Sequence, residues 1–361
     1  MRDALRRAEA FAERFGLRVP VLLAPMAGAC PVSLSAAVAQ AGGMGALGAL
    51  LHEPDAIAAW VADFRSKAGA GAPLQINLWM PDPQPHRDVD NEAALRDWLV
   101  RFGPPVDAAA ADAEPIEVDR QCEALLVARP TAASSIMGLF APPFVDRLKA
   151  AGIAWFATVT TVTEARAAEA AGADVIVAQG AEAGGHRGAF DAATARDAAV
   201  GLFALLPQVA DAVSVPVVAT GGIADARGVA AALMLGASAV QPGSGFLRCP
   251  EAALAPAWAD ALAGLAPEST QLTRAFSGRW GRAIATDYVR AAAGADAPEP
   301  APYPVQRALT APMRKVAQQA GDIQRMQAWA GQSAGLARAV PAAELMRKLW
   351  FDAQTLIAHE P

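Results

Sequence analysis

The chain has 361 residues, of which 54% are hydrophobic and only 18% are charged, and this composition excludes intrinsic disorder as the main state. The net charge is −6 and the basic residues form no cluster, so a nucleic-acid-binding role has no electrostatic basis. The length fits either two ordinary domains or one (β/α)8 barrel with additions.

Residues 3–15 have the spacing of an amphipathic helix, and a repeating unit follows them. In each unit a short apolar run ends in glycine, proline or a polar residue and precedes a helix-like stretch. Such nearly continuous apolar runs are typical of strands that are buried on both faces of a parallel sheet. Eight runs fit this description: 21–25, 43–47, 74–79, 133–138, 155–159, 175–180, 217–222 and 239–244.

Helical spacing separates the runs, for example over residues 144–151 and 226–235. Gly172 and Gly236 each stand between a helical stretch and the next run, where a glycine ends a helix in a left-handed cap. Eight βα units predict an α/β protein with a (β/α)8 TIM barrel over residues 18–250. An open, doubly wound sheet is the alternative, because counting runs does not show that the sheet closes.

Two segments exceed the bare barrel. Residues 81–130 contain an acidic stretch and a helix near residues 119–128, and we interpret them as an insert in the third βα unit. Residues 251–361 read as largely helical, with a proline-rich break at 298–304, and we expect a C-terminal segment that covers the barrel mouth. Loops after strands lie on the catalytic face of a barrel, so both segments are candidates to cover the site, with peripheral packing as the alternative.

Glycine-rich loops follow the last two runs. The seventh run ends in Gly221 and Gly222, and residues 241–244 end the eighth. Adjacent glycines let backbone N–H groups approach an anion, and the loops after strands 7 and 8 bind phosphate in many barrels. The pattern predicts a phosphate site, whereas a P-loop or a Rossmann fingerprint is not supported.

The sixth run opens into residues 179–188, which contain four glycines and one of the four histidines of the chain, His186. Such a loop can lie against a flat ligand, and an imidazole at a strand end can act as a base or a hydrogen-bond donor. We therefore predict that His186 is catalytic, against the alternative that a lone histidine is structural. Glu182 and Arg187 are interpreted as a local ion pair rather than as groups of the site.

Two earlier runs also carry candidate residues. Pro25 and Met26 offer small and flexible groups that suit packing under an aromatic ring, although a plain core turn has the same pattern. In the third run Gln75 and Asn77 alternate with apolar residues, and buried amides need partners. Asn77 is therefore predicted to hydrogen-bond a heteroaromatic ring.

The three cysteines lie far apart and form no CxxC pair, which argues against a disulfide framework and against a metal site. The N-terminal residues are too charged for a secretory signal, and no apolar stretch is long enough to span a membrane. We expect a cytoplasmic protein with no membrane partner.

These motifs together resemble the nitronate monooxygenases, once called 2-nitropropane dioxygenases, which are FMN-dependent barrel enzymes. The resemblance runs from about residue 18 to residue 335 and is most specific around His186. The segments that carry it are residues 24–26, 75–77, 179–186, 219–223, 241–244, 276–279 and 329–332.

The resemblance implies FMN-dependent oxidation of alkyl nitronates, with nitroalkanes as a wider option, by O2 to carbonyl compounds and nitrite. It implies that His186 is catalytic and hydrogen-bonds the nitro or nitronate group or takes a proton from a nitroalkane carbon. Met137 and Tyr303 are expected to line the substrate side. The implied FMN contacts are Pro25, Met26, Asn77, Gln179, Gly184, Gly185, Gly221, Gly222, Gln241, Pro242, Gly243 and Ser244.

The sequence departs from the family pattern at three places, one of which is the insert over residues 81–130, which has no counterpart in the pattern. Ser244 stands where threonine is common, which keeps the hydroxyl. Residues 133–138 lack the aromatic residue or histidine of some members, so the substrate preference stays open.

Two other functions remain open. FMN-dependent enoyl-acyl-carrier-protein reductases, which use NAD(P)H, share the glycine-rich histidine loop, although residues 277–279 and 329–332 favour the monooxygenase. A barrel that binds a phosphate ligand without flavin is the second alternative. The oligomeric state is also open, with a homodimer as one option.

Overall fold

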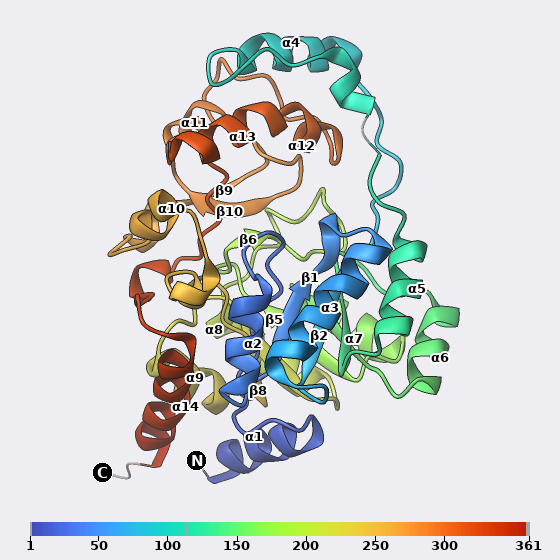
Figure 1. Cartoon of the computed structure of the whole chain (residues 1–361), viewed down its shortest axis with the longest axis vertical. Coiled ribbons are helices and arrows are strands. Elements are labelled where there is room, and N and C mark those ends of the chain that lie inside the picture. The colour runs from blue at the N-terminus through green and yellow to red at the C-terminus, as the bar shows by residue number, and fades with distance from the viewer. Residues whose placement is uncertain (1, 113, 359–361) are drawn as a thin grey trace.

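The computed structural model describes residues 2–112 and 114–358, which form a helix-wrapped sheet with a smaller lobe above it (Figure 1). The strands of the sheet are parallel, and their side chains are almost entirely buried, as the continuous apolar runs predict. In spatial order the strands are β1 (Gly45–Gly48), β2 (Leu74–Trp79), β3 (Ala132–Ile136), β4 (Ala154–Val159), β5 (Val175–Gln179), β7 (Val217–Thr220) and β8 (Ala239–Val240).

The first apolar run closes this sheet into a barrel. Val21 bridges Val240 on β8, and Leu22 bridges Met44, which precedes β1. The Leu22 N–H donates to the Val240 carbonyl at 2.8 Å, and the Leu23 N–H donates to the Met44 carbonyl at 2.9 Å. The predicted TIM barrel is therefore confirmed and the open sheet is wrong, although the first run contributes two bridging residues rather than a strand over 21–25.

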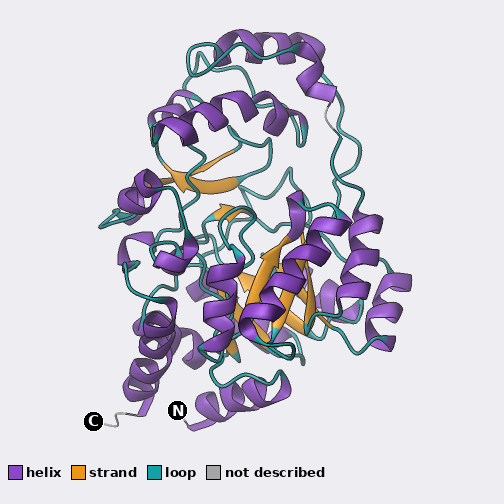
Figure 2. Ribbon diagram, viewed as in Figure 1, coloured by secondary structure: helices purple, strands orange, loops and turns teal. Residues whose placement is uncertain are grey.

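Helices ring the barrel (Figure 2). Each follows its strand along the chain, and polar caps start several of them: Thr161 and Glu164 form a capping box, and the Asp225 carboxylate accepts from the Arg227 N–H. The ring contains α2 (Val32–Gln40), α3 (Pro54–Ala68), α5 (Val118–Ala128), α6 (Pro142–Ala150), α7 (Val162–Ala170), α8 (Leu202–Ala212) and α9 (Ala226–Met234).

The two ends of the chain complete the barrel. Helix α14 (Ala342–Ala358) packs between α9 and α2, which is the place of the eighth barrel helix. Helix α1 (Arg2–Arg14) lies across the lower end, where Phe11 and Phe15 pack with Phe156 of β4. Part of residues 251–361 thus lies on the barrel wall and not over its mouth, because α14 buries its apolar face against those helices.

The smaller lobe joins segments that are far apart in sequence (Figure 1). From the segment after β2 it takes α4 (Val89–Leu99) and η2 (Ala108–Asp112), whereas α5 packs on α3 and β2 as the barrel helix of that unit. From the C-terminal part it takes β9 (Thr270–Thr273), β10 (Gly281–Ile284), α11 (Asp287–Ala291), α12 (Val305–Leu309) and α13 (Ala311–Ala320).

The lobe has its own apolar core. Leu95 and Leu99 of α4 pack with Phe276, Tyr288 and Leu309 from the C-terminal part. The C-terminal segment is therefore mainly helical but contains two strands. None of the helices among the described residues has the length and apolar character that a membrane crossing requires.

Candidate active site

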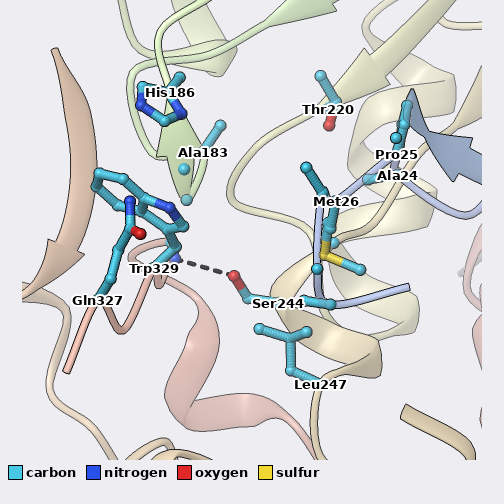
Figure 3. Close-up of a pocket in the computed structure, with 18 of the residues that line it drawn as sticks. Ala24, Pro25, Met26, Ala183, His186, Thr220, Ser244, Leu247, Gln327 and Trp329 are labelled. Atoms are coloured by element: carbon cyan, nitrogen blue, oxygen red, sulfur yellow. Dashed lines mark hydrogen bonds between the residues drawn. The ribbon is translucent and has the colours of Figure 1, made fainter. Parts of the chain in front are cut away.

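A cavity of about 390 Å³ opens at the carboxyl ends of the barrel strands, beneath the smaller lobe. Figure 3 shows several of the side chains that line it, including His186, Ser244 and Trp329. Barrel enzymes place their chemistry at this end. Twelve residues selected from the sequence line it: Pro25, Met26, Asn77, Gln179, Gly184, Gly185, His186, Gly221, Gly222, Gln241, Gly243 and Ser244.

Three other selected residues lie outside this lining. The Pro242 carbonyl accepts from the Ala24 N–H at 3.1 Å, which joins two strand ends. Met137 is buried with a positive φ of 67° at the end of β3. The Tyr303 ring packs on Trp79, with 5.6 Å between the ring centroids, so Tyr303 stands behind a lining residue.

His186 lies where the barrel meets the smaller lobe. It lies in β6 (Gly185–His186), a short strand that leaves the barrel and pairs with β10 of the smaller lobe, with Gly281 opposite His186. Gln179 holds the same loop from below: its Nε2 donates to the His186 carbonyl at 3.1 Å, and its Oε1 accepts from the Gly188 N–H at 2.8 Å. The backbone of the histidine is therefore fixed from two sides.

Three side chains contact the imidazole of His186. Its Nε2 lies 2.7 Å from the Ser277 Oγ. Trp79 and Trp329 each meet the imidazole edge-on, with 4.7 Å between the ring centroids. Among the described residues Nδ1 has no hydrogen-bond partner, so it is the ring nitrogen available to a ligand.

The surroundings of His186 keep it neutral. Burial, together with the guanidinium groups of Arg279, Arg307 and Arg314, lowers its pKa to about 3. The Ser277 hydroxyl lies 3.3 Å from the Arg279 carbonyl and can donate to it, which leaves the Ser277 Oγ to accept from a protonated Nε2. In that tautomer Nδ1 carries a lone pair and can accept a proton or a hydrogen bond.

Two arginines give the cavity a positive roof. Arg307 and Arg314 line it from α12 and α13. Arg314 donates to Thr310, to Gln327 and to a backbone carbonyl, all of them neutral acceptors. In the part of the chain that the structure describes, neither guanidinium pairs with a carboxylate. The roof therefore favours an anionic ligand.

The expected ion pair between Glu182 and Arg187 is wrong. The Glu182 carboxylate accepts from the Leu202 N–H at 2.9 Å, at the start of α8. The buried Arg187 guanidinium donates to the carbonyls of Gly180 and Gln179 at 2.6 and 3.3 Å. Both charges hold the loop backbone, because the strand end and the helix start offer them unsatisfied peptide groups.

The loops after β7 and β8 form a cradle of free amide groups. Gly221 and Gly222 have φ values of 101° and 71°, in the region that glycine enters most easily. The N–H groups of Gly222, Gly243 and Ser244 make no hydrogen bond to other described residues. A Cβ built on Gly243 would lie 3.3 Å from the Met26 Sδ, so a side chain would intrude here.

Amide side chains line the floor of the cavity. Gln75 donates to the Gln241 Oε1 at 3.0 Å and to the Leu23 carbonyl at 2.9 Å, while its own buried Oε1 has no partner among the residues that the structure describes. Asn77 donates to the Ser134 Oγ at 2.9 Å. As predicted, these buried amides have hydrogen-bond partners, and most of the partners come from neighbouring strands. Asn77 and Gln241 also line the cavity.

Five residues near His186 were not selected from the sequence as site residues. Ser277 and Trp329 fall within the C-terminal segments that carry the family resemblance, and that resemblance could have marked them as site residues. Trp79 ends an apolar run and reads as core. The two arginines of the roof carry no local pattern, since only the fold of the smaller lobe turns them toward the cavity.

The closed α/β barrel has a cavity at the carboxyl ends of its strands. A neutral histidine, two arginines and free amide groups line this cavity, and this is the arrangement of a barrel enzyme whose site suits an anion. The nitronate monooxygenase family model matches residues 9–352, and the chain belongs to that family. The protein is thus an oxidoreductase, as expected from the sequence.

Relatives and solved structures resemble this chain over almost its whole length. A nitronate monooxygenase of Pseudomonas aeruginosa is 39% identical over 347 residues, covering 94% of this chain and 97% of that protein. The structure of nitroalkane oxidase from Streptomyces ansochromogenes has a TM-score of 0.84 and 36% identity, covering 97% of this chain and 100% of that chain. FabK from Thermotoga maritima has a TM-score of 0.74 and 25% identity, covering 96% of each chain.

Proposed function

We propose that the protein oxidises alkyl nitronates with O2, with nitroalkanes as a second substrate class, and that FMN is its cofactor. The products are carbonyl compounds and nitrite. Two nitronate anions and one O2 molecule balance with two carbonyl compounds and two nitrite ions. The observation that carries the proposal is the neutral His186 near two arginines that pair with no carboxylate among the described residues, which suits a small anion that holds its charge on oxygen.

The residues present fit FMN. The free amide groups of Gly222, Gly243 and Ser244 suit its phosphate, because unsatisfied N–H groups without side chains can surround an anion. Met26, Asn77 and Gln241 would face its ring system from the strand ends. Bound FMN would accept the electrons that leave the substrate.

The protein residues have separate tasks in this reaction. Arg307 and Arg314 attract the nitronate and balance its charge. His186 offers Nδ1, which accepts a proton from the carbon of a nitroalkane and so converts it into the nitronate. Ser277 holds the ring, while Trp79 and Trp329 exclude water from it.

The decisive experiment compares electron donors. The purified protein is expected to be yellow, with absorbance near 450 nm, and to release nitrite from ethylnitronate in air. Under anaerobic stopped-flow conditions the nitronate should bleach the flavin rapidly. Rapid bleaching by NAD(P)H, with none by nitronate, would support the enoyl reductase alternative, and a colourless protein that takes up no FMN would support the flavin-free barrel. The homodimer and the cytoplasmic location stay predictions.

A further inference from the structure

A second cavity of about 490 Å³ lies beside the first, between α2 and α3. Its walls include Cys30, Val32, Leu47, His52 and Trp60. The residues that carry the proposed reaction do not include those specific to this cavity.

This second cavity runs from the surface into the barrel. Ser33 and Lys67 are exposed at its outer rim, whereas Leu47, at 1% exposure, and Gly48 are buried at its inner end. Three residues line both cavities: Met26, Gly28 and Gly48. The inner end of the second cavity is therefore a wall of the first.

A single turn of backbone separates the two cavities. The Met26 N–H and carbonyl both contact the Cys30 Sγ, at 3.3 and 3.1 Å, which ties the turn at its two ends. A Cβ built on Gly48 would lie 2.7 Å from the Ala27 nitrogen, so the strand end packs directly on this turn. The flexible Met26 side chain stands at the start of this turn and lines both cavities.

The second cavity differs from the first in charge. Burial lowers the pKa of His52 and raises the pKa of the Cys30 thiol, so both side chains are neutral. Asp63 and Lys67 at the rim neutralise each other at 2.6 Å. An anion would find no partner along this wall, while the first cavity offers it the two arginines of the roof.

We propose that the cavity between α2 and α3 is the entry and holding site for O2, separate from the route that the anionic nitronate takes under the roof. The proposal rests on the proposed function for O2 as the co-substrate. A small apolar molecule meets no net charge in this cavity, and Val32, Leu47 and Trp60 offer it apolar contacts of the kind that hold xenon in proteins. Because Met26 lines both cavities, O2 held in the second cavity lies next to the site proposed for FMN.

Xenon tests the site without any catalysis. Crystals of the unmodified protein under xenon pressure should show xenon between Cys30, Leu47 and Trp60, with or without FMN. Val32→Trp, which fills the cavity from the first turn of α2, should remove it, and Ser33→Trp at the exposed rim is the second variant if Val32→Trp does not fold. Absence of xenon from the unmodified protein would overturn the proposal.

Kinetics then separate the two routes. In Val32→Trp the second-order rate of reoxidation by O2, after anaerobic reduction with dithionite, should fall at least about threefold, while reduction by ethylnitronate stays within about twofold. Val127→Trp, on the exposed face of α5, is the matched control and should change neither rate. Equal losses in both half-reactions, or an unchanged reoxidation rate with xenon excluded, would contradict the proposal. Failure of ethylnitronate to reduce the protein would count against the proposed function alone, because dithionite and xenon do not depend on it.

Discussion

The Nε2 atom of His186 lies 2.7 Å from the Oγ of Ser277, although 91 residues separate them in the chain. His186 comes from the barrel and Ser277 from the smaller lobe, and the pairing of β6 with β10 brings their backbones together. The position of the proposed catalytic group is therefore set jointly by both parts of the fold.

Replacing His186 tests its role as a base. In His186→Asn the turnover of neutral nitroalkanes should fall about 100-fold, because no other group replaces the free Nδ1 as proton acceptor. Turnover of preformed nitronates should fall far less, since they have already lost that proton. FMN content, measured by absorbance, should be retained. Equal turnover of nitroalkanes by the variant and the parent protein would remove His186 from the proton transfer.

Ser277→Ala tests whether the serine positions the imidazole. Loss of one hydrogen bond of about 1 kcal/mol should lower kcat for a nitroalkane by roughly fivefold, with little change in KM. Ser238→Ala, a buried serine outside the site, is the matched control and should leave both constants unchanged. If KM rises instead and kcat is constant, the serine acts on substrate binding and not on the histidine.

The acid stability of the protein should report the neutral state of His186. Its pKa is lowered from an ordinary 6.5 to about 3 in the fold, so between these values only the unfolded chain binds the proton. The free energy of unfolding must therefore fall as the pH is lowered from 6.5 toward 3, by about 1–2 kcal/mol at pH 5 from this group.

Urea unfolding of the parent protein and of His186→Gln at pH 7 and pH 5 checks this. The variant should lose less stability on acidification, by the amount just given. His52, whose pKa is also lowered, is present in both proteins and cancels in the comparison. Equal losses in the two proteins would show that His186 titrates normally in the fold.

The positive roof is tested through Arg307. Arg307→Met keeps much of the side-chain volume but removes one charge from the cavity, so KM for ethylnitronate should rise about tenfold. KM for a neutral nitroalkane should change little, and added salt should weaken nitronate binding less in the variant. Arg166→Met, on the exposed face of α7, is the matched control. A similar rise for charged and neutral substrates would indicate lost packing rather than lost charge.

The cradle is tested by adding one methyl group. Gly222→Ala places a residue at φ 71°, which costs about 1 kcal/mol of stability, and puts a Cβ 3.5 Å from the Glu182 side chain, beside an amide group of the cradle. Gly16→Ala carries the same strain at φ 66° with no atom within 4 Å, so it isolates the backbone cost. FMN affinity, measured by fluorescence titration, should fall only in Gly222→Ala. Equal affinities in the two variants would place the phosphate elsewhere.

Several features of the protein followed from local sequence. Eight apolar runs marked the barrel, because strands buried on both faces need continuous apolar residues. The glycine pairs and the loop around His186 marked the catalytic end, because free amide groups require residues without side chains. These are properties of short segments, and twelve residues chosen from them line one cavity.

Other features depend on contacts that no local pattern encodes. Closure of the barrel depends on the bridge between Val21 and Val240. The eighth helix position is taken by α14, which follows the smaller lobe in the chain. Glu182 and Arg187 are close in sequence, yet each bonds to backbone groups that lie nearer than the opposite charge. Ser277, Trp329 and Arg307 reach His186 because the pairing of β10 with β6 folds the C-terminal part over the strand ends. The sequence by itself determined the barrel and the loops at its catalytic end. The tertiary structure decided which distant side chains surround His186, because hydrogen bonds and charges depend on distance in space and not on separation along the chain.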